Sequence, residues 1–180
     1  MTTSPVDPGP GPGEPQSRAE RARTRIPPAS LREPVHLLAL GFGSGLAPVA
    51  PGTFGSIVGL LLALLVLQAG WWAAAGAALL ASFGGIWICG ESARRLGVHD
   101  HPAIVWDEIA GMMIVMLAAP ATWWGVALAF ALFRLFDVWK PWPIREVDHG
   151  MRGGAGIMLD DILAALWAVA VLLLIRPYTT

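Results

Sequence analysis

Three long stretches of this 180-residue chain contain no Asp, Glu, Lys or Arg, and they cover residues 35–90, 109–133 and 162–175. About 20 apolar residues span a bilayer, and roughly 17 suffice where the membrane thins or flanking side chains reach its surface. The first stretch is long enough for a helical hairpin, residues 109–133 fit another hairpin, and the last stretch fits one closing span. The sequence therefore predicts an all-α, multi-pass membrane bundle of about five spans.

Residues inside the two longer stretches indicate where the chain turns. The first hairpin is expected over roughly residues 55–69 and 71–90, with Gln68 and Gly70 at its turn. In the other hairpin, Pro120 is expected at the turn because proline ends a helix. A tryptophan pair follows each turn, which is typical of residues at a membrane surface.

The overall composition excludes several classes of protein. Only 14% of the residues are charged against 55% that are hydrophobic, and the formal net charge is −1. This balance excludes a nucleic-acid-binding protein that works through bulk positive charge. The single cysteine excludes a disulfide scaffold and a multi-cysteine zinc site.

Residues 1–34 differ in composition from the rest of the chain. Seven of the fifteen prolines lie before Leu31, together with Gly-Pro repeats and several arginines. Such a segment buries too little apolar surface to offset the entropy of ordering it. We expect residues 1–34 to be a disordered cytoplasmic arm and residues 35–180 to form the membrane domain.

The order of the spans sets the topology. Each hairpin crosses the membrane twice, so the chain is back on the side where it started after the first hairpin and again after the second. Residues 1–34, 91–108 and 134–161 then share one face, which carries eleven of the twelve Lys and Arg residues. The excess of these residues on cytoplasmic loops makes that face cytoplasmic. We therefore expect a cell (inner) membrane protein whose polar chemistry faces the cytoplasm.

Acidic residues at the ends of the predicted spans are the main candidates for chemistry. They are Asp107, Glu108, Asp137, Asp160 and Asp161. Carboxylates next to or inside an apolar helix are costly unless they are paired, bind a metal or face water. A hard cation that suits carboxylate oxygens would compensate them, and magnesium is the foremost candidate.

Basic residues accompany these acids in the segment "FRLFDVWKPWPI". Arg134, Asp137 and Lys140 fall within about 120° of one helical face if the helix continues to Trp139. Arg134 and Lys140 can bind phosphate oxygens, and magnesium is often held by carboxylates together with a substrate phosphate. This indicates a phosphorylated substrate. The alternative is that the acids and bases only form ion pairs between helices.

The segment "GFGSGLAPVAPGTFGS", residues 41–56, is uncharged and rich in glycine and proline. We expect it to be re-entrant or interfacial, since irregular backbone at membrane depth must be buried in protein or line a wet cavity. Thr53 or Ser56 could cap the first membrane helix, whose amide end would attract an anion. A plain tight connection is the alternative.

Four blocks of the chain resemble the phosphatidylglycerophosphatase A family. They are "GSGLAPVAPGTFGS", "WDEIAGM", "FRLFDVWKPWPI" and "GGAGIMLDDILA", and the resemblance covers roughly residues 37–166. It implies an integral membrane, magnesium-dependent lipid phosphatase. Such an enzyme would remove the terminal phosphate of phosphatidylglycerophosphate to give phosphatidylglycerol for phospholipid synthesis.

A mechanistic hypothesis follows from the residues and the resemblance together. Its expected metal ligands are Asp107, Glu108, Asp160 and Asp161. Asp137 is expected to complete the metal shell or to act as a base, so that all five carboxylates are candidate catalytic residues. The expected phosphate-binding residues are Arg134, Lys140, Thr53 and Ser56. The partner is then a phospholipid substrate in the membrane.

Other functions remain alternatives. A lipid phosphotransferase of the CDP-alcohol type is one, although its D-x2-D-G-x2-A-R signature is absent from the sequence. A small transporter should show charges at the bilayer centre or an inverted repeat, and neither is visible. A non-enzymatic scaffold would need no metal. The oligomeric state is open.

Overall fold

The computed structural model describes residues 26–97, 101–142, 144 and 153–176. Within these residues every regular element is helical, so the prediction of an all-α fold is confirmed. In chain order the elements are η1 (Pro28–Arg32), α2 (Pro34–Ala39), η2 (Gly41–Leu46), α3 (Pro51–Leu67), α4 (Trp71–Leu96), α5 (Trp106–Met116), α6 (Trp123–Trp139) and α8 (Gly154–Ile175).

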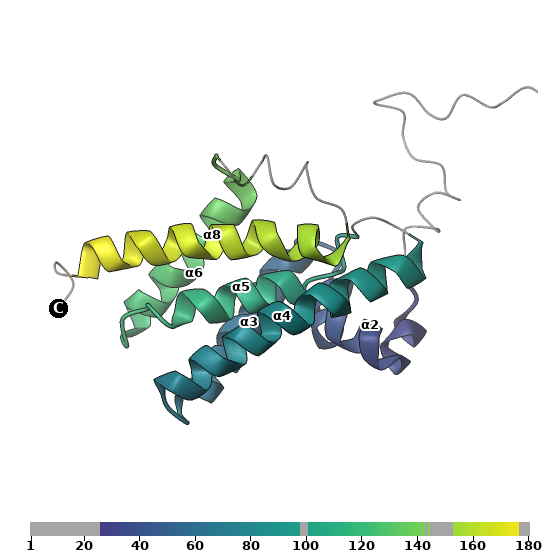
Figure 1. The fold of residues 1–180 in the computed structure, drawn as a ribbon, viewed down its shortest axis with the longest axis horizontal. Helices are drawn as coiled ribbons and strands as arrows, with labels where there is room; N and C mark the ends of the chain where they lie inside the picture. Colours follow the sequence, from purple (N-terminus) through teal and green to yellow (C-terminus); the bar gives the residue numbers. More distant parts are fainter. Residues whose placement is uncertain (1–25, 98–100, 143, 145–152, 177–180) are drawn as a thin grey trace, which may run out of the picture.

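Helix α5 is the centre of the bundle. It contacts α3, α4, α6 and α8, and seven of its eleven residues are buried. In Figure 1, α8 runs along one side of α5 and crosses α6, while α3 and α4 lie on the other side. The two acidic residues in the first turn of α5 are therefore surrounded by neighbouring helices.

Small residues allow α3 to approach α5 closely. A Cβ atom built on Gly55 would lie 2.7 Å from Cβ of Val105, and one built on Gly59 would lie 2.6 Å from the carbonyl oxygen of Ile109. Larger side chains at these positions would push the helices apart. Such contacts between small residues are typical of helices that pack inside membranes.

Both predicted hairpin turns are present. Helix α3 ends at Leu67 and α4 begins at Trp71, and between them Gly70 adopts a positive φ of 105°. After α5, the side chain of Thr122 caps α6 by accepting a hydrogen bond from the N–H of Gly125 at 3.1 Å. The turn residues thus end one apolar helix and begin the next.

Two helices, α4 and α8, are long and apolar enough to cross a membrane. Helix α3 is apolar but shorter. Helix α5 has eleven residues, which corresponds to about 16 Å against a hydrocarbon core of about 30 Å. The five predicted spans are thus not established by helix length.

The end of the predicted arm is folded against the bundle. Residues 1–25 lie outside the described residues, but Pro28–Arg32 form η1, and Ile26 is buried against Leu40 and Ala103. The expectation of disorder is therefore wrong for this described end. The physical reason is that Ile26 is an apolar anchor within a segment that is otherwise polar and rich in proline.

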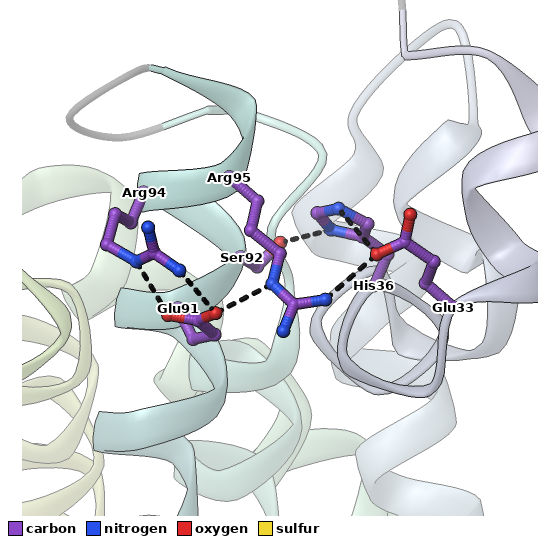
Figure 2. Close-up of polar contacts among 6 residues, drawn as sticks. All are labelled: Glu33, His36, Glu91, Ser92, Arg94 and Arg95. Atoms are coloured by element: carbon purple, nitrogen blue, oxygen red, sulfur yellow. Dashed lines mark hydrogen bonds and ion pairs between the residues drawn. The ribbon is translucent and has the colours of Figure 1, made fainter.

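Polar side chains fasten α2 to α4, as Figure 2 shows. Nδ1 of the buried His36 lies 2.9 Å from Oγ of Ser92, and Arg95 donates to Glu33 at 2.9 Å. Helix α2 also reaches the start of α5, because the carbonyl of its last residue, Ala39, accepts the N–H of Val105 at 2.9 Å. Helix α2 therefore connects α4 with the segment that leads into α5.

Candidate active site

Three carboxylates meet where α5 begins beside α8. Asp107 and Glu108 lie in the first turn of α5, and Asp161 lies in the second turn of α8. One oxygen from each residue lies within 4.8 Å of the other two. Gly111 of α5 lies against both α6 and α8, since a Cβ atom there would lie 2.7 Å from Cζ of Phe133 and 3.2 Å from the carbonyl oxygen of Asp161.

This group of three has the properties of a cation site. Asp161 is only 3% exposed. Among the described residues, Oε2 of Glu108 and Oδ2 of Asp161 are buried without a hydrogen-bond partner. Buried carboxylate oxygens are costly unless a positive charge or hydrogen bonds compensate them. The three side chains offer hard oxygen ligands, so they fit Mg²⁺.

The other two predicted carboxylates have basic partners. Asp137 accepts a hydrogen bond from Nη1 of Arg134, one turn earlier on α6. Asp160 accepts one from Nζ of Lys140 at 2.7 Å, which ties the end of α6 to α8. Asp160 and Asp137 thus each have a basic partner, as the ion-pair alternative expects, but Asp137 also lies beside Asp161 of the converging group. The metal-ligand role of Asp160 stays a prediction.

Helix α6 brings its basic residues to the same end of the bundle. It continues to Trp139, which was the condition for its acidic and basic residues to share one face. It stops there because Lys140 precedes Pro141, and the residue before a proline is disfavoured in the right-handed helical region. Lys140 instead adopts a left-handed conformation, with φ of 45°. From this position its ammonium group reaches Asp160 on α8.

The predicted cap at the start of α3 is wrong. Helix α3 begins at Pro51, and its N-cap is Ala50, which has a left-handed backbone and forms no side-chain cap hydrogen bond. Thr53 and Ser56 therefore lie inside the helix. Proline at the first position accounts for the earlier start, because it has no N–H that needs an intrahelical partner.

Ser56 nevertheless belongs to the site. Its hydroxyl donates to the carbonyl of Gly52 at 2.8 Å and accepts from Nη1 of Arg134 at 3.3 Å. The Thr53 side chain is half-buried and forms no hydrogen bond within the described part of the chain. The phosphate-binding roles of both residues stay predictions.

The sequence reasoning missed Gly52. A Cβ atom on this residue would lie 2.3 Å from Oε1 of Glu108 and 3.2 Å from Nη1 of Arg134. Bare backbone at Gly52 thus leaves room for an acid and a base from two other helices. The signal was the spacing of small residues along α3, at Gly52, Ser56 and Gly59, which marks one helical face.

Together these elements define a class of protein: an apolar helical bundle with a carboxylate-lined, basic-flanked site at one end. A model of the phosphatidylglycerophosphatase A family matches residues 37–176, and the chain therefore belongs to this family. The resemblance of the four sequence blocks is thus confirmed.

Two curated relatives have the name phosphatidylglycerophosphatase A. The protein of Escherichia coli (strain K12) is 44% identical over 152 residues, which cover 84% of this chain and 87% of the relative. The protein of Haemophilus influenzae is 45% identical over 154 residues, which cover 82% of this chain and 91% of the relative. No solved structure matches the chain.

Proposed function

We propose that this chain is a membrane-bound, magnesium-dependent phosphatase that hydrolyses phosphatidylglycerophosphate to phosphatidylglycerol and phosphate during phospholipid synthesis. The family and the names of its two relatives support the reaction. The observation that carries the mechanism is the convergence of three carboxylates beside two basic side chains.

Asp107, Glu108 and Asp161 would hold the magnesium ion. When bound, Mg²⁺ neutralises charge on phosphate oxygens and helps to ionise the attacking water. Asp160 remains a proposed further ligand: its Oδ2 accepts from Lys140, while its Oδ1 is buried without a hydrogen-bond partner among the described residues. The fit rests on buried, unpaired oxygens of Glu108 and Asp161 among the described residues.

The basic residues bind the phosphate. Arg134 presents a planar fork of donors, and Lys140 presents a compact charge, so that both stabilise negative charge on the transferred group. We assign the role of general base to Asp137, which takes a proton from the attacking water. The water oxygen forms the new bond to phosphorus, the ester P–O bond breaks, and Asp137 returns the proton to the leaving glycerol oxygen, so that the carboxylate is regenerated.

The membrane arrangement is part of the proposal. Five spans would place the site at the cytoplasmic end of the bundle in the inner membrane. Large apolar side chains point outward along the helices, among them Trp72, Leu80, Phe83, Trp123 and Leu174. Such a surface suits acyl chains. A lipid substrate could thus keep its tails in the bilayer while its phosphate enters the polar site.

A phosphate-release assay tests this proposal. The purified full chain in phospholipid vesicles is given phosphatidylglycerophosphate or phosphatidic acid, each with Mg²⁺ or with a chelator. We expect release from phosphatidylglycerophosphate with Mg²⁺ and at least about tenfold less in the other conditions, which corresponds to about 1.4 kcal/mol. Absence of release from phosphatidylglycerophosphate, or full activity with chelator, would refute it.

A further inference from the structure

Ser56 on α3 holds the guanidinium of Arg134 on α6. Ser56 is 0% exposed, and its hydroxyl proton is donated to the carbonyl of Gly52 at 2.8 Å. The same oxygen accepts a hydrogen bond from Nη1 of Arg134 at 3.3 Å. Because the hydroxyl has one proton and two lone pairs, it can serve both partners at once.

Both hydrogen bonds of Arg134 use the same nitrogen. Nη1 donates one hydrogen to Ser56 and the other to Asp137, so both hydrogens of this nitrogen are used. Within the residues that the structure describes, Nε and Nη2 have no hydrogen-bond partner. These two nitrogens form the edge of a guanidinium that can bind two oxygens of one phosphate.

The two residues differ in their access to a ligand. The Arg134 side chain is 19% exposed, whereas Ser56 is completely enclosed. A phosphate could therefore reach the arginine without touching the serine. Gly52 adds to this arrangement, because its missing side chain leaves room for Nη1 of Arg134 against α3.

We propose that Ser56 is a positioning residue, which fixes Nη1 so that the Nε and Nη2 edge of Arg134 is presented to the substrate phosphate. This inference rests on the proposed function. It differs from the direct phosphate contact expected from the sequence, because Ser56 acts through Arg134 and does not touch the lipid.

The test compares Ser56→Ala with Ser82→Ala. Both serines are buried and donate to the carbonyl four residues earlier, and Ser82 does so on α4 at 2.8 Å from Ala78. The full chain in vesicles is assayed with phosphatidylglycerophosphate, and with inorganic phosphate as inhibitor. We expect Ser56→Ala to lower kcat/KM roughly tenfold and to raise the inhibition constant similarly, since a hydrogen bond to a charged group is lost. Ser82→Ala should behave as the wild type.

Repeating the Ser56→Ala substitution in an Arg134→Lys variant distinguishes a positioning role of Ser56 from direct contact with the phosphate. Arg134→Lys keeps the charge but lacks the fork, so adding Ser56→Ala to it should cost less than about twofold. An equal loss in both backgrounds, or wild-type kinetics for Ser56→Ala, would overturn the proposal. If the wild type releases no phosphate, the proposed function fails instead. Calorimetric titration of wild type and Ser56→Ala with inorganic phosphate then decides the role of Ser56: weaker binding supports it, and equal binding overturns it.

Discussion

Nζ of Lys140 lies 2.7 Å from Oδ2 of Asp160, so the residue that ends α6 is tied to the second turn of α8. The next residue, Asp161, belongs to the group of three carboxylates on the other side of that helix. Neighbouring residues of one helix differ by about 100° in direction, which separates their partners. Two neighbouring aspartates of α8 thus have different surroundings, one at a lysine and one among carboxylates.

We expect Asp160→Asn to lower kcat/KM roughly tenfold, because Lys140 loses its charged partner. The Mg²⁺ concentration for half-maximal activity should stay within about twofold of wild type, since the three converging carboxylates remain. Activity is measured across a series of Mg²⁺ concentrations. A large rise in the Mg²⁺ requirement would instead make Asp160 a metal ligand.

Asp161→Asn should abolish activity and yet stabilise the metal-free protein. The buried carboxylate has an oxygen without a hydrogen-bond partner among the described residues, and it lies near two further acids. Replacing this buried acid with an amide removes the cost of placing it among other acids, for an expected gain of about 1–3 kcal/mol in the free energy of unfolding. Thermal unfolding in chelator measures this gain.

Added Mg²⁺ provides the companion measurement. It should raise the Tm of the wild type, since a ligand that binds only the folded state stabilises it. It should leave the Tm of Asp161→Asn nearly unchanged. A Tm rise of equal size in both proteins would contradict the assignment of Asp161 to the metal site.

Gly52→Ala should impair catalysis more than folding. The new methyl group would meet Oε1 of Glu108 at 2.3 Å, and that flexible side chain has to move. We expect kcat/KM to fall at least about tenfold, because a shift of roughly 1 Å at a reacting group is enough for such losses. Gly76→Ala on α4 is the matched control, since no atom lies within 4 Å of its added Cβ. Equal activity of the two variants would count against the placement of Glu108.

The contacts between α2 and α4 should differ in their effect on stability. His36→Ala leaves the buried Ser92 without its partner, and we expect a loss of about 1–3 kcal/mol in unfolding free energy. Arg95→Gln removes more exposed ion pairs, and their loss should cost less than the loss of the histidine, because water screens exposed charges. Urea-induced unfolding in mild detergent gives both values. The reverse order would show that the ion pairs, rather than the histidine, fasten α2.

Charge-free stretches and turn residues were enough to predict the longer helices α3, α4, α5, α6 and α8, but not the short elements η1, α2 and η2. Gly70 and Pro120 marked turns because their backbone restrictions are local properties of the chain. The pairing of Arg134 with Asp137 could likewise be anticipated, since residues three apart share a helical face. Local rules therefore predicted the parts of the fold that depend on local geometry.

Local rules could not predict which of the two neighbouring aspartates, Asp160 or Asp161, joins the carboxylate group. Whether Asp160 or Asp161 faces α5 depends on the rotation of α8, which follows from tertiary packing and not from the local sequence. Ser56 was expected to cap a helix because its residue type favours caps. Its contact with Arg134 joins residues 78 positions apart, and no local pattern reports such a pairing.

The central helix has a consequence for how the protein fits its surroundings. With eleven residues and four helical neighbours, α5 need not match the thickness of the lipid layer. Helices α4 and α8, by contrast, are long and apolar enough to cross a membrane, and helices of that kind adapt to its thickness by tilting. The acidic start of α5 is therefore held in place by neighbouring helices.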